Sequence, residues 1–248
     1  MSNVTCRFYE ELNDFLPQLW KKQDIPVSLK QRNSVKDMIE SLGVPHTEID
    51  LIIVNGNSVD FSYIVQPQDR INVYPVFESF DISPLNRLRP EPLRKTRFVL
   101  DVHLGKLAKY LRMLGFDTLY NNQYLDSDLA DIASSGAKRI LLTRDHGLLK
   151  HKRISHGYFV RETNPRRQVK EILNRFDLFK SIKAFSRCVH CNGLITRVEK
   201  KNIIEQIPAE ACKNYEHFVA CEDCRHIYWQ GSHYERMLKF IDTLINGD

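Results

Sequence analysis

The fold is decided first by residues 97–120, which read RFVLDVHLGKLAKYLRMLGFDTLY. The apolar run at 97–102 predicts a strand. The leucines that follow recur at helical spacing, so they predict a helix over 104–114 with one apolar face. A further apolar run predicts a second strand at 116–120. Strand, helix and strand in this order are typical of a parallel sheet, because parallel strands need a crossover connection.

Alternation of the same kind continues toward the C-terminus. We expect helices at 127–135, 146–151 and 165–178, and strands at 139–143 and 157–160. Such alternation indicates an α/β domain in which helices cover both faces of a parallel sheet. We place this domain at residues 97–183.

The first 80 residues have a different pattern. Strands are predicted at 4–9, 51–54 and 70–77, with a helix at 34–42 that Ser34 opens. This order resembles the ubiquitin-like β-grasp fold of small sulfur carriers, which end in a free Gly-Gly carboxylate. Here the last strand continues into a linker at 81–96, so carrier chemistry is not expected. We expect residues 1–80 to pack, to orient the rest of the chain, or to bind a protein partner of unknown identity.

The formal net charge of +5 conceals an asymmetry along the chain. Residues 1–80 carry 7 Lys and Arg against 11 Asp and Glu, which leaves 29 against 20 for the remainder. The N-terminal part is therefore −4 and the remainder +9. A basic body favours an anionic partner such as nucleic acid, although a charge excess is also typical of an ordinary solvated surface.

Two CxxC pairs lie in the C-terminal quarter, and we interpret residues 184–248 as a zinc ribbon followed by a helix. The cysteines are Cys188, Cys191, Cys221 and Cys224. Four thiolates close a tetrahedral shell and leave no position for a catalytic water, so we expect one structural zinc ion per chain. A redox dithiol or a pair of disulfides is the alternative.

Acidic residues follow two of the predicted strands. Asp101 ends the first strand, and Asp145 comes one residue after the strand at 139–143. Ligands of open parallel sheets bind at the carboxyl ends of the strands. On the intervening helix, Asp128 and Asp131 share one face. Clustered carboxylates hold Mg²⁺ or Mn²⁺, which neutralises charge during phosphodiester hydrolysis.

A family resemblance becomes specific at these residues. Three segments and the two CxxC pairs look like the Mut7-C ribonuclease family, a branch of the PIN-like nucleases with a C-terminal zinc ribbon: FVLDVHLGKLAKYLRMLGFDTLY, DSDLADIA and RILLTRDHGLL. The similarity covers about residues 97–240, and a β-grasp domain in front belongs to the same pattern. It implies that Asp101, Asp128 and Asp145 are catalytic and hold Mg²⁺ or Mn²⁺. The candidate supporting residues are Asp126, Asp131, Thr143 and Arg144.

Basic side chains near these carboxylates predict contacts with nucleic acid. The candidate binding residues are Lys106, Lys109, Arg112, Arg166 and Arg167. The first three lie outside the apolar stripe of the helix at 104–114. In the ribbon, Tyr228, Trp229 and Tyr234 are positioned either to stack on unpaired bases or to pack around the zinc site, and the sequence leaves both open.

The sequence thus predicts a metal-dependent ribonuclease that acts on RNA, with single-stranded RNA as the expected substrate and DNA as a second candidate. The competing interpretation is a nucleic-acid-binding or adaptor protein without turnover, in which Asp145 caps the next helix and Asp126 or Ser127 caps the helix before it. We expect a cytoplasmic protein, because the chain contains no apolar stretch long enough for a membrane span and begins without an apolar secretory segment.

Overall fold

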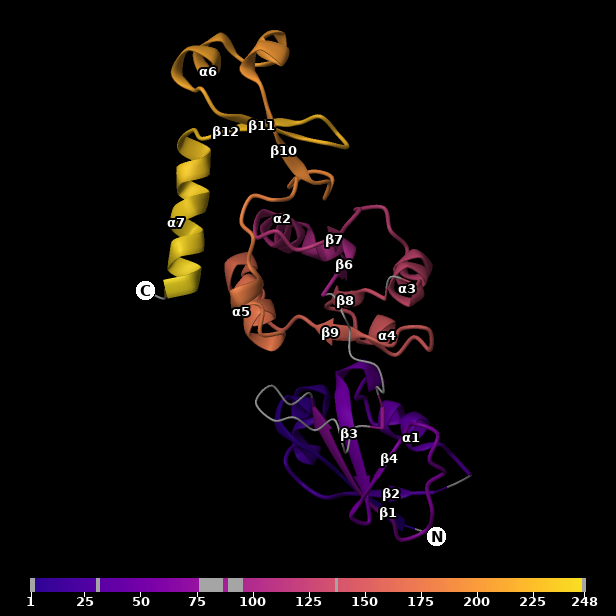
Figure 1. Cartoon of the computed structure of the whole chain (residues 1–248). Helices are drawn as coiled ribbons and strands as arrows, with labels where there is room; N and C mark the ends of the chain where they lie inside the picture. The colour runs from indigo at the N-terminus through magenta and orange to yellow at the C-terminus, as the bar shows by residue number, and fades with distance from the viewer. Residues whose placement is uncertain (1–2, 30–31, 76–86, 89–95, 137, 247–248) are drawn as a thin grey trace. The chain divides into compact units, whose positions relative to one another are not determined.

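The computed structural model describes residues 3–29, 32–75, 87–88, 96–136 and 138–246 (Figure 1). They form two compact units. The first combines the chain up to residue 95 with Leu125–Phe159, and the second combines Thr96–Tyr124 with Val160–Asp248. The predicted linker at 81–96 lies almost entirely outside the described residues, and the predicted domain boundaries stay predictions. In the described part of the chain, each helix is too short or too polar to span a bilayer.

The N-terminal part of the first unit is a β-grasp domain. Its elements are β1 (Asn3–Phe8), β2 (Ile25–Ser28), α1 (Val35–Ser41), β3 (Ile49–Val54), β4 (Asn57–Val59) and β5 (Arg70–Pro75). The strand order is β2-β1-β5-β3-β4, with the central pair β1 and β5 parallel and the other pairs antiparallel. Ser34 opens α1 as predicted, because its hydroxyl accepts a hydrogen bond from the Asp37 backbone N–H at 3.1 Å. The ubiquitin-like class is confirmed.

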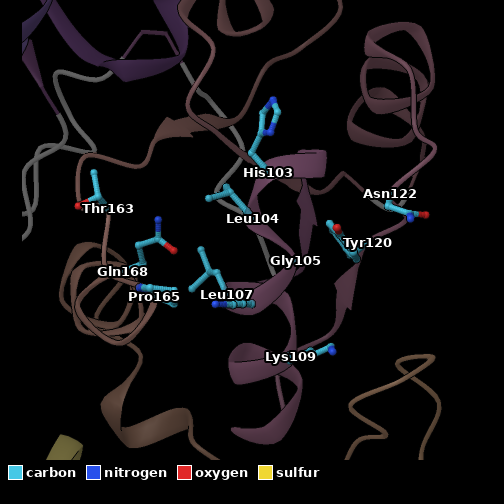
Figure 2. A pocket seen from close by; sticks show the side chains of 11 residues that line it. His103, Leu104, Gly105, Leu107, Lys109, Tyr120, Asn122, Thr163, Pro165 and Gln168 are labelled. Atoms are coloured by element: carbon cyan, nitrogen blue, oxygen red, sulfur yellow. The ribbon is translucent and has the colours of Figure 1, made fainter.

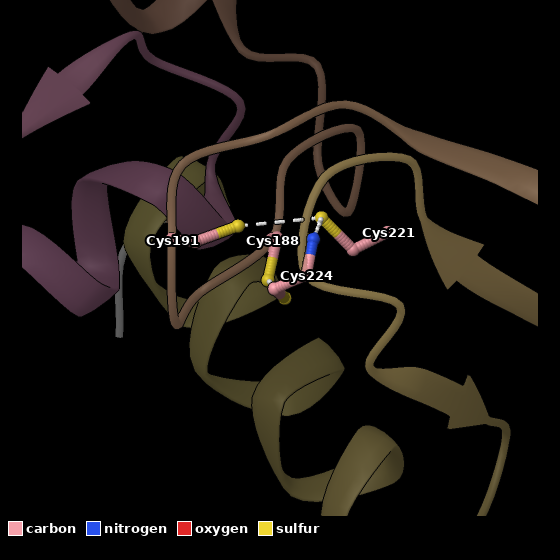
Figure 3. Close-up of side chains that lie close together, drawn as sticks. All are labelled: Cys188, Cys191, Cys221 and Cys224. Carbon is pink, nitrogen blue, oxygen red and sulfur yellow. Dashed lines mark hydrogen bonds between the residues drawn. The ribbon is translucent and has the colours of Figure 1, made fainter.

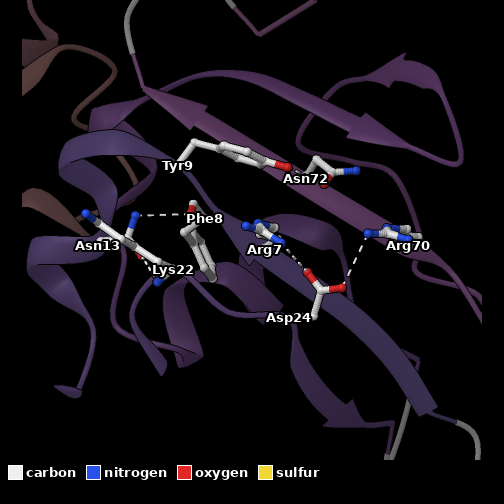
Figure 4. A network of polar contacts seen from close by, with 8 residues as sticks. All are labelled: Arg7, Phe8, Tyr9, Asn13, Lys22, Asp24, Arg70 and Asn72. Atoms are coloured by element: carbon white, nitrogen blue, oxygen red, sulfur yellow. Dashed lines mark hydrogen bonds and ion pairs between the residues drawn. The ribbon is translucent and has the colours of Figure 1, made fainter. Parts of the chain in front are cut away.

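Side-chain contacts fix the segment that follows β1 (Figure 4). The buried Asn13 amide donates to the carbonyl of Phe8 at 3.1 Å and accepts from the backbone N–H of Lys22 at 2.7 Å. These bonds satisfy the backbone around a short 3₁₀ helix, η1 (Glu10–Phe15). Asp24 pairs with Arg7 and Arg70, but all three side chains are partly exposed, so these ion pairs contribute little.

Strands and helices alternate through the middle of the chain, as predicted. The elements are β6 (Phe98–Leu100), α2 (Gly105–Met113), β7 (Thr118–Leu119), α3 (Asp126–Ser134), β8 (Ile140–Thr143), α4 (His146–Leu149), β9 (Gly157–Phe159) and α5 (Pro165–Arg175). In the second unit β6 pairs in parallel with β7, and in the first unit β8 pairs in parallel with β9. The α/β class with parallel strands and flanking helices is confirmed.

Most of these elements are shorter than predicted, and two of them end early for identifiable local reasons. The first strand ends at Leu100, because Asp101 turns the chain into a 3₁₀ helix, η4 (Val102–Leu104). The last helix ends at Arg175, because Asp177 adopts a left-handed φ of 47° that no helix continues.

The C-terminal part of the second unit is a small three-stranded antiparallel sheet, with one helix between its first two strands in sequence and another after its last strand. It contains β10 (Ile195–Val198), α6 (Ala209–Asn214), β11 (Phe218–Cys221), β12 (Ile227–Trp229) and α7 (Ser232–Asn246), in strand order β10-β11-β12. Its small core is built from Ile203, Ile207 and Phe218, and Trp229 packs against it. Packing is therefore one role of Trp229, in agreement with one of the two predicted interpretations.

Within the first unit, the β-grasp domain is joined to the segment 125–159 by buried contacts. They come from a 3₁₀ helix, η3 (His46–Glu48), whose three residues are all buried. His46 Nε2 lies 2.8 Å from the carbonyl of Ile154, and the Thr47 hydroxyl donates to the carbonyl of Leu149 at 3.3 Å. The Glu48 carboxylate accepts a hydrogen bond from the backbone N–H of Phe159. A fully buried carboxylate is tolerated only where such donors are provided, so this interface is specific.

Phe15, at the end of η1, adds an aromatic contact to the same interface. Its ring centroid lies 5.0 Å from that of His146 and 5.7 Å from that of Phe159, both in edge-on arrangements. His146 directly follows Asp145. The β-grasp domain therefore supports the strand-end loop that carries one of the candidate catalytic carboxylates.

We predict that Phe15→Ala lowers the free energy of unfolding by about 2 kcal/mol, because a partly buried ring and its aromatic contacts are lost. Backbone amides of residues 146–159 should exchange faster with solvent. The matched control is Leu19→Ala, which truncates a side chain that is 82% exposed and should change neither quantity. Equal effects of the two substitutions in chemical denaturation would contradict the proposed support.

Candidate active site and metal centre

The four predicted cysteines converge at the base of the three-stranded sheet (Figure 3). Their sulfur atoms all lie within 4.8 Å of one another, with 3.6 Å between Cys188 and Cys224 and 3.3 Å between Cys191 and Cys221. A zinc ion bound to four thiolates at about 2.3 Å requires sulfur separations of roughly 3.8 Å. The donor set and its spacing therefore fit a closed structural zinc site.

Neighbouring donors favour the thiolate form of Cys188, whereas burial raises the pKa of Cys191 to about 12 and also raises that of Cys224. The backbone N–H of Gly193 points at Cys191 Sγ and that of Cys224 at Cys221 Sγ, each at 3.5 Å. Burial alone would raise the pKa of Cys188, but hydrogen bonds from the Tyr228 hydroxyl and from backbone N–H groups lower that pKa to about 7. The Tyr228 oxygen lies 3.0 Å from Cys188 Sγ. Tyr228 thus supports the metal ligands, a role that the sequence did not indicate.

The first cysteine knuckle is fastened to α2 and β7. Arg112, on α2, is 4% exposed and donates from its guanidinium to the carbonyls of Val189 and His190 at 3.2 and 2.8 Å. It also donates to the carbonyl of Thr118 at 2.9 Å. The Asn192 side chain accepts from the backbone N–H of Thr118 at 2.8 Å and donates to Asp117 at 2.8 Å.

These contacts correct the expectation for Arg112. The helical stripe predicted that its side chain points away from the apolar core and contacts nucleic acid. Instead, the guanidinium is buried against backbone carbonyls, and desolvation lowers its pKa from the ordinary value. Arg112 is therefore not a candidate for nucleic-acid binding, because its N–H groups bond to the carbonyls of the first cysteine knuckle.

Asp101 occupies the predicted position at the end of β6 in the second unit. It is 7% exposed, and its Oδ1 atom accepts a hydrogen bond from the backbone N–H of Val102 at 2.6 Å. The residues that follow it, His103 to Lys106, line one side of a cavity of about 440 Å³. A buried carboxylate therefore lies at the carboxyl end of a parallel strand, as the sequence predicted, two residues before the first residue that lines this cavity.

Asp128 and Asp145 belong to the first unit and are both exposed at helix N-termini. Asp145 is the N-cap of α4, and its Oδ1 accepts from the backbone N–H groups of Gly147 and Leu148 at 2.6 and 3.3 Å. Asp128 lies at the third position of α3 and accepts from the Leu125 N–H at 3.0 Å. Capping by Asp145 agrees with the structural interpretation of this residue.

The predicted cap of α3 is wrong. Neither Asp126 nor Ser127 precedes the helix, because α3 already begins at Asp126 and Leu125 occupies the N-cap. Instead, Asp128, the third residue of the helix, accepts a hydrogen bond from the backbone N–H of the N-cap Leu125, as in a capping box. Asp131 is exposed on the same helix and forms an ion pair with Arg153.

Thr143 and Arg144 shape the loop between β8 and α4. Thr143 is fully buried, and its hydroxyl accepts from the backbone N–H of Asp145 at 2.9 Å. The exposed Arg144 places its guanidinium carbon 5.9 Å from the ring centroid of Phe159. Both residues therefore fix the course of the chain at Asp145.

The cavity beside Asp101 lies wholly within the second unit, between α2 and the start of α5 (Figure 2). Lys106 and Lys109 line it, together with His103, Asn122 and Gln168. Neither His103 nor Asn122 was predicted from the sequence as a site residue. Asn122 comes two residues after the predicted strand at 116–120, so the strand-end rule that selected Asp101 would also have found it.

Arg166 and Arg167 lie in the first turn of α5, and both are exposed. Their backbone N–H groups donate to the side chain of Asn164, which caps the helix. Arg166 places its guanidinium carbon 5.2 Å from the ring centroid of Phe240 on α7. Both arginines remain candidates for nucleic-acid contacts.

Taken together, these features define an α/β protein with parallel strands, a ubiquitin-like domain at its N-terminal end and a four-cysteine candidate metal centre in its C-terminal quarter. A family model described as the Mut7-C RNAse domain matches residues 96–241, and one described as Mut7-C ubiquitin matches residues 1–81. The chain therefore belongs to the Mut7-C RNAse domain family, which confirms the resemblance. No curated protein and no solved structure gives a significant match.

We predict that the purified chain contains one zinc ion and that Cys221→Ser releases it, with loss of order in residues 184–246. Zinc binding contributes on the order of 10 kcal/mol to small sites of this kind. The matched control is Cys212→Ser, which changes a cysteine outside the quartet. Elemental analysis that finds no zinc in the unmodified protein would contradict this assignment.

We further predict that Arg112→Lys lowers the free energy of unfolding by about 2–4 kcal/mol, because lysine keeps the buried charge but cannot reach several carbonyls in one plane. Zinc should also leave faster when a chelating dye is added. The control Arg197→Lys changes an exposed arginine of β10 and should affect neither measurement. Unchanged stability of Arg112→Lys would show that the knuckle does not depend on this anchor.

Proposed function

We propose that this chain is a metal-dependent ribonuclease that hydrolyses RNA phosphodiester bonds, with DNA as a second candidate substrate. The observation that carries the proposal is Asp101, a buried carboxylate at the carboxyl end of β6, two residues before the first residue that lines a cavity with two lysines. Membership of the Mut7-C RNAse domain family supports the nuclease class.

In this proposal Asp101, Asp128 and Asp145 are ligands of Mg²⁺ or Mn²⁺. The chemistry of the set fits these ions, because carboxylate oxygens are the hard ligands that they prefer. Asp126, Asp131 and Thr143 are candidates for supporting roles. Such an ion, when bound, supplies positive charge for the attacking and leaving oxygens of the phosphodiester.

The capping bonds of Asp128 and Asp145 are compatible with this role. Each cap uses one carboxylate oxygen, Oδ2 of Asp128 and Oδ1 of Asp145, whereas a carboxylate offers two oxygens with about four acceptor sites. Capping also restricts the rotation of the side chain. Each cap therefore holds a carboxylate that is proposed as a metal ligand in a fixed orientation at the N-terminus of its helix.

The protein itself contributes substrate positioning. Lys106 and Lys109 line the cavity beside Asp101, and Arg166 lies at the start of α5 in the same unit. Their cationic groups are suited to bind phosphates of the RNA backbone, which fixes the register of the strand without reading its sequence. Arg144, beside Asp145, is a further candidate for a phosphate contact.

The capping geometry also favours a second candidate function. Because Asp145 caps α4 and Asp128 completes the cap of α3, the same carboxylates are explained in an adaptor protein that binds nucleic acid without cleaving it. Turnover in the presence of Mg²⁺ or Mn²⁺ separates the two functions. In either case a thiolate zinc site is typical of a reducing compartment, and we propose a cytoplasmic location on this ground.

We predict that Asp101→Asn or Asp145→Asn reduces cleavage of labelled single-stranded RNA about a hundredfold or more, which corresponds to roughly 2.7 kcal/mol of transition-state stabilisation. Asparagine preserves size and remains a good N-cap, so the free energy of unfolding should change little. Asp177→Asn, an exposed residue after α5, is the matched control and should cleave normally. Full activity of an Asp101→Asn, Asp145→Asn double variant would refute the mechanism.

A further inference from the structure

Three cavities of the second unit lie next to one another, because each shares lining residues with the next. The cavity beside Asp101 shares Lys106 and Lys109 with a second cavity of about 370 Å³ between α2, α5 and α7. The second shares Val189, His233 and Met237 with a third cavity of about 530 Å³ at the three-stranded sheet. We refer to the three together as the ribbon track.

The charged side chains that line the ribbon track are all basic. Its lysines and arginines are Lys106, Lys109, Arg166, Arg187 and Arg236, and five histidines accompany them. Among the described residues that line the three cavities there is no aspartate or glutamate. The chain as a whole carries 31 acidic residues, so their exclusion from the track indicates an anionic occupant.

Aromatic rings concentrate at the end of the track that lies on the sheet. Phe185 and Tyr234 lie with ring centroids 4.6 Å apart, and the rings of His190 and His226 are 4.3 Å apart. All four residues line the third cavity together with Tyr228 and Trp229. Ring faces of this kind bind unpaired bases by stacking, whereas the bases of a duplex are already stacked on one another.

The extent of the track indicates more than one nucleotide. Along α7 it includes His233, Arg236, Met237 and Phe240, which recur at helical spacing and therefore share one face. From His233 to Phe240 the helix rises about 10 Å, and the sheet cavity and the Asp101 cavity extend the track at its two ends. An acidic peptide would match the charge but would leave the aromatic end without a counterpart.

We propose that the ribbon track binds single-stranded RNA, with an unpaired base in the aromatic cavity at the sheet and backbone phosphates along α7 and α2 toward Asp101. This inference rests on the proposed ribonuclease function and specifies its substrate. In this proposal the three-stranded sheet and α7 bind single strands in preference to duplexes, and the bound strand extends toward Asp101. The sequence indicated the aromatic residues of the ribbon but not the basic and aromatic face of α7.

The test is equilibrium binding of a labelled oligouridine of about twelve nucleotides to the zinc-loaded full chain, in buffer without Mg²⁺ or Mn²⁺, followed by fluorescence anisotropy. A duplex RNA of the same length and a polyglutamate of similar charge serve as competitors. The single strand should bind at least tenfold more tightly than either. Equal or tighter binding of duplex or polyglutamate would overturn the proposal.

Variants locate the binding on the track. Lys109→Gln and Arg236→Gln should each weaken binding about tenfold and reduce the slope of log Kd against log salt concentration by about one. Tyr234→Ala should weaken binding about tenfold with little change of the slope, and Tyr234→Phe should restore it. Lys239→Gln, an exposed lysine of α7 outside the three cavities, is the matched control and should bind normally.

The outcome separates this inference from the proposed function. If the track variants bind RNA like the unmodified protein while cleavage remains intact, the proposed binding site is wrong and the proposed ribonuclease function is unaffected. If binding follows the track but no metal supports cleavage, the ribonuclease is wrong and the binding site stands.

Discussion

The buried guanidinium of Arg112 is the interaction on which the arrangement of the second unit depends. A cation without water must be surrounded by acceptors, and here the acceptors are backbone carbonyls of β7 and of the first cysteine knuckle. Because the same side chain bonds to both, the cysteine knuckle and α2 are held in a fixed position relative to one another. Lys106 and Lys109 of the same helix line the cavities, so α2 connects the cysteine quartet to the basic surface.

The first unit uses a buried carboxylate for a similar purpose. Glu48 of the β-grasp domain accepts a hydrogen bond from the backbone at Phe159, and Phe15 packs against His146 and Phe159. These contacts surround the loop that carries Arg144 and Asp145. A domain that resembles a small carrier protein thus has a structural explanation in this chain: it supports the strand-end loop between β8 and α4.

Much of the fold was predictable because it follows from local periodicity. The leucine spacing of α2, the Ser34 cap of α1 and the strand-helix alternation after residue 97 all depend on neighbours within a few residues. Paired CxxC motifs likewise predicted the cysteine quartet. Short strands such as β2 and β4 were missed, because a run of three or four residues carries too little pattern.

The site was less predictable, because its residues act through contacts distant in sequence. Arg112 has the spacing of a solvent-facing residue, and only the cysteine knuckle, more than 70 residues later, explains its burial. Tyr228 likewise acquires its role from Cys188, 40 residues away. Capping by Asp128 from inside α3 shows that a carboxylate near a helix start is not necessarily the first cap residue.

The central proposal is that Asp101 and Asp145 are ligands of a catalytic Mg²⁺ or Mn²⁺ ion. Titration of the zinc-loaded chain with Mn²⁺, followed by electron paramagnetic resonance, tests it without any substrate. The account predicts that the unmodified protein binds Mn²⁺ and that Asp101→Asn and Asp145→Asn each weaken this binding at least tenfold, corresponding to about 1.4 kcal/mol. Mn²⁺ binding that is absent from the unmodified chain, or that is unchanged by either substitution, would contradict it.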